Sequence, residues 1–269
     1  VKYCEHYFPD LLPHLSSCKS PQQMFGAIAK TWYAEKNGID PKNLVVVSVM
    51  PCTAKKFEMG RDDQAAAGVP DIDIALTTRE LARLIETAGL NFKNLPDEEF
   101  DNPLGTGSGA GLIFGATGGV MEAALRTAYA KLTGENPPAD AFREIRGQKP
   151  WRESTFHIGD ITLRLAVVSG LAGARQLMDA IRARQVSYDF VEVMACPGGC
   201  SGGGGQPIHD GEDFTAERGR NLYQLDKNST IRFSHENPSI QVLYNEFLGK
   251  PLSELSHHLL HTDQKTWTL

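Results

Sequence analysis

Three cysteines follow two apolar segments, and they are the residues best suited to chemistry in this chain. Residues 44–49 lead into Met50-Pro51-Cys52, and residues 190–193 lead into Met194-Ala195-Cys196. Cys200 comes four residues later, in a Cys-Pro-Gly-Gly-Cys-Ser run that continues into four glycines. In α/β proteins ligands bind at the carboxyl ends of parallel strands, and glycines let backbone approach a ligand closely. The spacing predicts a metal-sulfur centre, above all an iron-sulfur cluster, although Cys196 and Cys200 alone would also suit zinc or a redox thiol pair.

Other groups give weaker signals. The glycine-rich residues 105–119 resemble a phosphate-binding turn, but they lack a clear preceding strand and the strict dinucleotide-binding spacing. Close approach of backbone to a buried cofactor is the better interpretation. Cys4 and Cys18 have no partner at ligand spacing, and we expect neither to bind metal. His257 and His261 stand four residues apart and could chelate a metal, but histidines in a polar tail more often have no such role.

The segments around these residues alternate between strand and helix patterns. A helix is predicted to begin at Ser20, with Pro21 in its first turn and Gln23 closing a capping box. Strands are predicted at residues 44–49, 73–76, 162–168 and 190–193, and helices from Cys52, from about residue 79, and at 120–131, 172–184 and 240–248. This order predicts an α/β fold with two lobes of mostly parallel sheet flanked by helices, and with the cofactor at the seam.

Composition limits the function further. The 269 residues carry a net charge of -6 and no basic run, which disfavours nucleic acid and anionic membrane surfaces as partners. The apolar stretches are strand-length and fall short of the roughly 20 residues of a membrane span. Five cysteines without the spacing of a disulfide framework favour a reducing compartment, and we expect a cytoplasmic protein. The chain begins at Val1 inside an apparent helix, so we expect further sequence upstream, including any targeting signal.

Three longer motifs, residues 50–58, 113–124 and 194–207, together resemble the catalytic domain of iron-only (FeFe) hydrogenases. Residues 16–23 and 234–238 match the family as well, so the resemblance covers nearly the whole chain. We expect one such domain over residues 1–269. Its approximate parts are a lobe of residues 1–100 plus 187–210, a lobe of residues 101–186, and a C-terminal helical segment, 211–269.

The resemblance implies an active site called the H-cluster. This cofactor is a 4Fe-4S cubane joined through one cysteine sulfur to a 2Fe subcluster that carries CO, CN and a bridging amine dithiolate. The family pattern assigns Cys52 and Cys196 as cubane ligands, and Cys200 as the ligand that also bridges to the 2Fe subcluster. A cubane needs four ligands. The fourth is expected from an upstream segment with the family's first cysteine motif, which this sequence lacks.

The resemblance also implies roles for residues around the cluster. Lys55 is expected to donate hydrogen bonds to a cyanide, because an ammonium group and an anionic ligand stabilise each other. From spacing alone, Lys55 and Lys56 would be two solvated lysines. Ser16 is expected to belong to the proton path. The residues expected to line the 2Fe pocket are Ser20, Pro21, Gln22, Met50, Pro51, Phe114, Gly115 and Met194.

The function implied is reversible reduction of protons to hydrogen. Electrons would enter through the cubane from ferredoxin or another redox protein or subunit, and hydrogenase maturases would supply the 2Fe subcluster. Two alternatives stay open: a hydrogenase-like iron-sulfur assembly or scaffold protein without the 2Fe subcluster, and a hydrogen sensor on the same fold. Lys55, the Ser20-Pro21-Gln22 pocket and Phe114 favour the enzyme, because a scaffold has no cyanide to bind.

Overall fold

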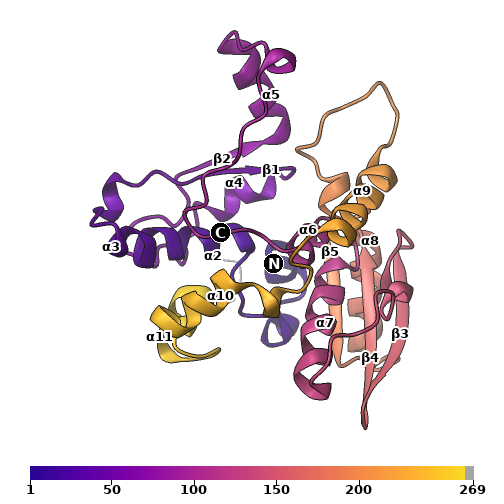
Figure 1. Cartoon of the computed structure of the whole chain (residues 1–269). Helices are drawn as coiled ribbons and strands as arrows, with labels where there is room; N and C mark the ends of the chain where they lie inside the picture. The colour runs from indigo at the N-terminus through magenta and orange to yellow at the C-terminus, as the bar shows by residue number, and fades with distance from the viewer. Residues whose placement is uncertain (264–269) are drawn as a thin grey trace. The chain divides into compact units, whose positions relative to one another are not determined.

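The computed structural model describes residues 1–263 and divides the chain into two compact units (Figure 1). Unit 1 contains residues 1–105 and the chain from residue 242 onward, and unit 2 contains residues 106–241. Each unit combines parallel strand pairing with flanking helices, which confirms the predicted α/β class. The two units are described one at a time.

Unit 1 contains a two-stranded parallel sheet. β1 (Val47–Met50) pairs with β2 (Ile74–Thr77), with Met50 opposite Thr77. Because the strands run in the same direction, both chains leave the sheet at the same edge, β1 toward α4 and β2 directly into α5. The helices of unit 1 are α1 (Lys2–Tyr7), α2 (Pro21–Ile28), α3 (Ala34–Lys36), α4 (Ala54–Glu58), α5 (Thr78–Thr87) and α11 (Glu254–Leu260). α10 (Pro238–Leu243) contains the division between the units, and π-helical turns continue α2 (Ala29–Tyr33) and α10 (Tyr244–Leu248).

Two ion pairs join the α2 region to the segment that enters β2. Lys19 Nζ lies 2.9 Å from Asp71 Oδ2, and both side chains are almost completely buried. Lys30 Nζ lies 2.7 Å from Asp73 Oδ2, and that carboxylate also accepts from the backbone N–H of Val46 just before β1. Removing one partner of a buried pair costs about 3–5 kcal/mol. These pairs therefore hold α2 and the two strands in a fixed arrangement within unit 1.

Unit 2 contains a three-stranded mixed sheet. β4 (Ile161–Ser169) lies in the middle, antiparallel to β3 (Trp151–Ile158) and parallel to β5 (Phe190–Met194). β3 and its hairpin were not predicted, and their two-residue turn has Gly159 at φ +57°. The pairing of β5 with β4 also puts residues 187–210 in unit 2, whereas the sequence grouped them with residues 1–100.

Two helices cover opposite faces of β4 (Figure 1). Successive side chains of a strand point to opposite faces. Accordingly, Leu165 and Val167 pack in one cluster with residues of α7 (Gly119–Thr133), and Ala166 and Val168 pack in another with residues of α8 (Leu171–Arg182). The other helices of unit 2 are α6 (Gly109–Leu112) and α9 (Thr215–Asn228).

One predicted helix start is confirmed except for its capping box, and another is wrong. Ser20 is the N-cap of α2, with Pro21 next, but the Ser20 side chain forms no cap hydrogen bond, and its hydroxyl donates to Glu58. α4 begins at Ala54 with Thr53 as its N-cap, so Cys52 precedes the helix.

Candidate functional site

The first candidate ligand, in unit 1, follows β1. Met50 ends the strand, and Pro51 and the partly buried Cys52 form a bend before α4. Within residues 1–263, neither Cys52 nor any of the other four cysteines forms a disulfide bond. The parallel pairing of β1 with β2 therefore delivers a candidate ligand to the sheet edge where the sequence placed it.

Glu58, at the end of α4, accepts hydrogen bonds from three residues predicted to belong to the site. The Lys55 ammonium lies 2.9 Å from Glu58 Oε1 and 2.8 Å from Oε2. The Ser20 hydroxyl donates to Oε2 at 2.7 Å, and Gln22 Nε2 donates to the same oxygen at 2.8 Å. Gln22 Oε1 is buried with no hydrogen-bond partner among the described residues. The structure thus brings Ser20, Gln22 and Lys55 together around a carboxylate that the sequence analysis did not single out.

The neighbouring Lys56 points to a different set of partners. Its ammonium donates to the carbonyl of Ala75 at 2.8 Å and lies 2.9 Å from Glu80. Glu80 forms a capping box with Thr77 at the start of α5. The backbone N–H of Thr77 and the Lys56 ammonium lower the pKa of Glu80 to about 2. Lys56 therefore anchors α4 to β2 and α5, and Lys55 belongs to the candidate site.

Ser16 lies on an exposed segment held by the end of α11. Its hydroxyl accepts from the backbone N–H of Cys18 at 3.2 Å. Backbone hydrogen bonds join Lys19 N–H to the Leu260 carbonyl and Thr262 N–H to the Ser17 carbonyl. This short bridge positions the residue predicted to lie on the proton path.

The two tail histidines are stacked, with ring centroids 4.8 Å apart, and His261 Nδ1 lies 2.8 Å from the Ser17 hydroxyl. Burial and the nearby His257 lower the pKa of His261. Among residues 1–263 no group of three or more His, Cys, Asp and Glu side chains is arranged to hold a metal ion. The predicted ligands are divided, with Cys52 in unit 1 and Cys196 and Cys200 in unit 2.

The loop after β5 carries the candidate cysteines of unit 2. Gly170 N–H donates to the Met194 carbonyl at 2.8 Å, and Gly198 N–H donates to the Ser169 hydroxyl at 2.8 Å. Gly199 has φ +87°, and a Cβ there would meet the backbone of Gly115, Ala116 and Thr117 at 2.8–3.0 Å. Only glycine fits such a position. The loop that carries Cys196 and Cys200 is therefore packed directly on the segment that contains Phe114 and Gly115.

Glu192 joins the strand that precedes the cysteine loop to the start of α7. The buried carboxylate accepts from the backbone N–H of Gly118 at 2.6 Å and of Met121 at 2.7 Å, at the start of α7. Burial raises the pKa of Glu192, against the lowering effect of these two hydrogen bonds. Glu192 lies on β5, four residues before Cys196, so one side chain sets the position of α7 relative to the cysteine loop. A glutamate inside an otherwise apolar strand was the sequence signal for this role.

The glycines before α7 serve protein packing. A Cβ on Gly118, at φ +93°, would meet the Ile145 carbonyl oxygen at 2.3 Å, and one on Gly119 would meet the Ile113 carbonyl oxygen at 1.7 Å. At these two glycines the backbone lies close to other protein backbone. The predicted close approach to a buried cofactor stays a prediction. Phe114 is partly buried and packs against a cluster that includes Ile113 and Ala123.

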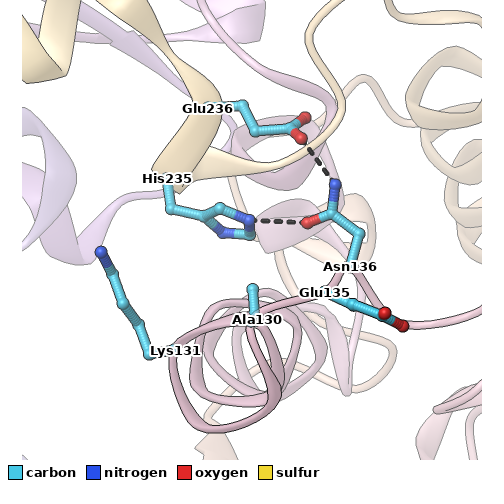
Figure 2. A pocket seen from close by; sticks show the side chains of 7 residues that line it. Ala130, Lys131, Glu135, Asn136, His235 and Glu236 are labelled. Carbon is cyan, nitrogen blue, oxygen red and sulfur yellow. Dashed lines mark hydrogen bonds between the residues drawn. The ribbon is translucent and has the colours of Figure 1, made fainter.

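A shallow pocket of about 250 Å³ elsewhere in unit 2 contains none of these residues (Figure 2). It lies at the end of α7, where His235 Nε2 is 2.8 Å from Asn136 Oδ1 and Asn136 donates to Glu236 at 2.5 Å. His235 Nδ1 lies 3.2 Å from the Thr127 hydroxyl. Both imidazole nitrogens thus have protein partners, so His235 is not available as a metal ligand.

Comparison with known proteins gives a consistent answer. A family model described as "Iron only hydrogenase large subunit, C-terminal domain" matches residues 1–204, and one described as "Iron hydrogenase small subunit" matches residues 212–266. The chain is 53% identical to an NADP-reducing hydrogenase subunit of Solidesulfovibrio fructosivorans, over 97% of this chain and 45% of that protein. It is 43% identical to iron hydrogenase 1 of Clostridium pasteurianum, over 98% of this chain and 47% of that protein. The chain thus spans about half the length of these relatives.

Solved structures and a more distant group of relatives complete the comparison. An apo FeFe-hydrogenase of Chlamydomonas reinhardtii has a TM-score of 0.84 at 43% identity, covering 99% of this chain and 74% of that one. The cytosolic iron-sulfur assembly component 3 of Rattus norvegicus is 32% identical over 94% of this chain and 54% of that protein. Within residues 1–263, no helix is both long and apolar enough to cross a membrane. On the match of the large-subunit model to most of its length, the chain belongs to the iron-only (FeFe) hydrogenase family and contains the family's C-terminal H-cluster domain.

Proposed function

We propose that this chain is the hydrogen-activating part of an FeFe hydrogenase and takes part in the reversible reduction of protons to hydrogen. Because it spans about half of its curated relatives, electron delivery is assigned to segments or proteins beyond these residues. Ferredoxin or another redox protein or subunit is the proposed electron partner. One relative is named a periplasmic Fe hydrogenase large subunit, from Nitratidesulfovibrio vulgaris, so cytoplasmic location of this chain stays a prediction.

The residues present suit an H-cluster. Cys52 and Cys196 are proposed to hold the 4Fe-4S cubane, and Cys200 to hold it and bridge to the 2Fe subcluster with its CO, CN and amine dithiolate. None of the three forms a disulfide bond among the described residues, and all three are partly buried. A fourth cubane ligand is proposed to come from a segment outside this sequence, and maturases to insert the 2Fe subcluster. When bound, the H-cluster supplies the redox chemistry that forms and splits the H–H bond.

The chain's own residues then bind, orient and exclude water. Lys55 offers a positive charge and N–H donors to an anionic ligand, a charge-assisted contact that is stronger than a neutral hydrogen bond. Gln22 and Ser20 are held beside it by Glu58. The pocket walls proposed to exclude water are Met50, Pro51, Pro21, Phe114, Gly115 and Met194. Ser16, on its exposed segment, is proposed to pass protons toward the site.

The observation that supports this function best is the cluster of donors around Glu58. A lysine, a serine and a glutamine converge on one carboxylate on the helix that follows Cys52, and Gln22 retains an unused buried acceptor. A protein that only holds a cubane needs no such set. The alternative is an iron-sulfur assembly role. The 32% identity to a cytosolic iron-sulfur assembly component supports this role, but it is lower than the 53% identity to the hydrogenase subunit.

A paired lysine substitution tests the proposed enzyme. Lys55→Ala and Lys56→Ala are made in the full-length protein that contains this chain, which is matured and purified without oxygen. Hydrogen evolution with a reduced viologen dye is then measured. Loss of a charge-assisted hydrogen bond of 1.5–3 kcal/mol predicts a drop of roughly 10- to 100-fold for Lys55→Ala. Lys56→Ala, which removes an anchor of α4, keeps activity near that of the wild type.

Two outcomes contradict the proposal. If the wild-type protein retains iron and sulfide after maturation but neither evolves nor consumes hydrogen, the assembly role becomes the better explanation. If Lys55→Ala evolves hydrogen as fast as Lys56→Ala, the proposed role of Lys55 is wrong.

A further inference from the structure

We propose that Glu58 is a positioning residue of the site: it aims the Lys55 ammonium and fixes Ser20 and Gln22 around it. The partner assigned to Lys55 rests on the proposed function, but the positioning itself does not. Glu58 receives four hydrogen bonds from three side chains, all between 2.7 and 2.9 Å. No other carboxylate within residues 1–105 of unit 1 has hydrogen bonds to Lys55, Ser20 or Gln22.

The contacts connect parts of the chain that are distant in sequence. Ser20 and Gln22 lie at the start of α2, and Lys55 and Glu58 lie on α4, more than thirty residues later. α4 has only five residues, too few for a stable helix on its own. Lys56 fastens one side of α4 to β2 and α5, and Glu58 fastens the other side to α2. Glu58 is therefore the contact that orients the face of α4 carrying Lys55.

The hydrogen-bond inventory shows what this arrangement leaves available. A lysine ammonium has three N–H donors, and two of the three on Lys55 meet the oxygens of Glu58. The Ser20 hydroxyl donates to Glu58 and keeps its lone pairs, and Gln22 keeps a buried, unpartnered Oε1. Each side chain thus uses one hydrogen-bonding group to hold its position and keeps another available for a bound molecule. This division suits a site that is formed before its ligand arrives.

Charge explains why the anchor is a glutamate. The Lys55 and Glu58 side chains are about a quarter exposed, at 25% and 26%. The carboxylate offsets the charge of the ammonium and restrains a stem with four rotatable carbons. Without it, Lys55 would move toward water and the Ser20 hydroxyl would lose the group to which it donates.

The test compares two glutamates that each hold one of the adjacent lysines. Glu58→Gln removes the charge next to Lys55, and Glu80→Gln does the same next to Lys56 as a matched control. In the full-length protein without its 2Fe subcluster, acylation of each lysine by a water-soluble ester is followed by peptide mass spectrometry. Loss of a partly exposed ion pair predicts a rise of about 1.5- to fivefold in Lys55 labelling for Glu58→Gln, with Lys56 unchanged. Glu80→Gln produces the opposite pattern.

A second readout concerns the loaded protein. Glu58→Gln is expected to shift the infrared cyanide bands of the matured protein, and Glu58→Asp to restore them in part because the charge returns on a shorter stem. Equal Lys55 labelling in Glu58→Gln and the wild type, or unshifted cyanide bands, overturns the positioning role. If the wild type shows no cyanide bands at all, the proposed function fails, but the labelling comparison still decides the role of Glu58.

Discussion

Asp226→Asn should strongly destabilise unit 2, because Asp226 is the centre of a buried ion network. Its carboxylate accepts from Arg126 at 2.8 and 2.7 Å, and from Arg232 at 3.2 and 3.1 Å. Arg126 also lies 2.7 Å from Glu122, which in turn binds Arg146 at 2.7 Å. The network joins α7, which follows the Phe114 segment, to α9, which follows the cysteine loop. The substitution keeps the shape of the side chain and removes its charge.

The magnitude follows from burial. The side chains of Asp226 and Arg126 are 1% and 3% exposed. Breaking a buried pair costs about 3–5 kcal/mol. Arg126 keeps its contact with Glu122, and Arg232 is 21% exposed and can turn to water, so we expect the lower limit, about 3 kcal/mol. At roughly 3 °C per kcal/mol for a protein of this size, the Tm falls by roughly 10 °C.

The pH dependence has a defined sign. Burial alone would raise the pKa of Asp226, but the hydrogen bonds from Arg126 and Arg232 outweigh burial and hold the pKa below its usual value. A carboxyl group with a lowered pKa in the folded state stabilises the fold above its unfolded pKa of about 4, and that contribution is lost as pH falls through the folded value. The wild type and Asp226→Asn should therefore differ most near pH 7 and converge in acid.

The assay is urea and thermal unfolding of the cluster-free chain under reducing conditions, followed by circular dichroism. The matched control is Asp140→Asn, which removes a carboxylate that is 67% exposed and lies 3.3 Å from Arg146 in the same network. An exposed pair of this kind contributes less than about 1 kcal/mol. If Asp226→Asn is no more destabilising than Asp140→Asn, the reasoning from burial is refuted.

Two further predictions concern the segments that hold the site. Glu192→Gln leaves one of two buried backbone N–H groups, on Gly118 or Met121, without an acceptor. It should lower the free energy of unfolding in urea by about 1–3 kcal/mol. An unchanged unfolding midpoint would contradict the proposed connection between β5 and α7. Burial would raise the pKa of Asp63, but hydrogen bonds from Thr262, a neighbouring glutamine and an arginine lower it. Its contribution is therefore present above about pH 4 and lost in acid. Asp63→Asn should raise the exchange rate of the Thr262 N–H, relative to its intrinsic rate, at pH 7 but not in acid; equal exchange in both proteins at pH 7 would argue against this contact.

Much of the α/β order was predictable because its strands are apolar runs that end in chemically distinctive residues. The ends of β1 and β5 were placed near Cys52 and Cys196 on that basis, and the structure confirms both strands. β3 was missed because its pattern is mixed, with polar residues facing water along an edge strand, although a Gly-Asp turn before β4 was a hairpin signal. The grouping of residues 187–210 depends on which strand β5 pairs with, and no local pattern encodes that choice.

The candidate site also depends on contacts that local sequence patterns do not encode. The sequence selected Lys55, Ser20 and Gln22 only through family resemblance, and their common partner Glu58 requires contacts across more than thirty residues. Ser20 is an example. The local sequence predicted a capping box, but the structure instead has a tertiary hydrogen bond from the Ser20 hydroxyl to Glu58. The roles of the cysteines as ligands stay predictions, because they concern a group that only the loaded protein contains.

The central claim is that this chain holds an H-cluster, and an infrared spectrum tests it most directly. The full-length protein that contains the chain is matured, purified without oxygen and measured in the region of metal-bound CO and CN. The account predicts bands of both ligands, and their loss in Cys200→Ser, because Cys200 is proposed to bridge the cubane to the 2Fe subcluster. Iron and sulfide without any CO or CN bands would contradict the account and favour an iron-sulfur assembly role.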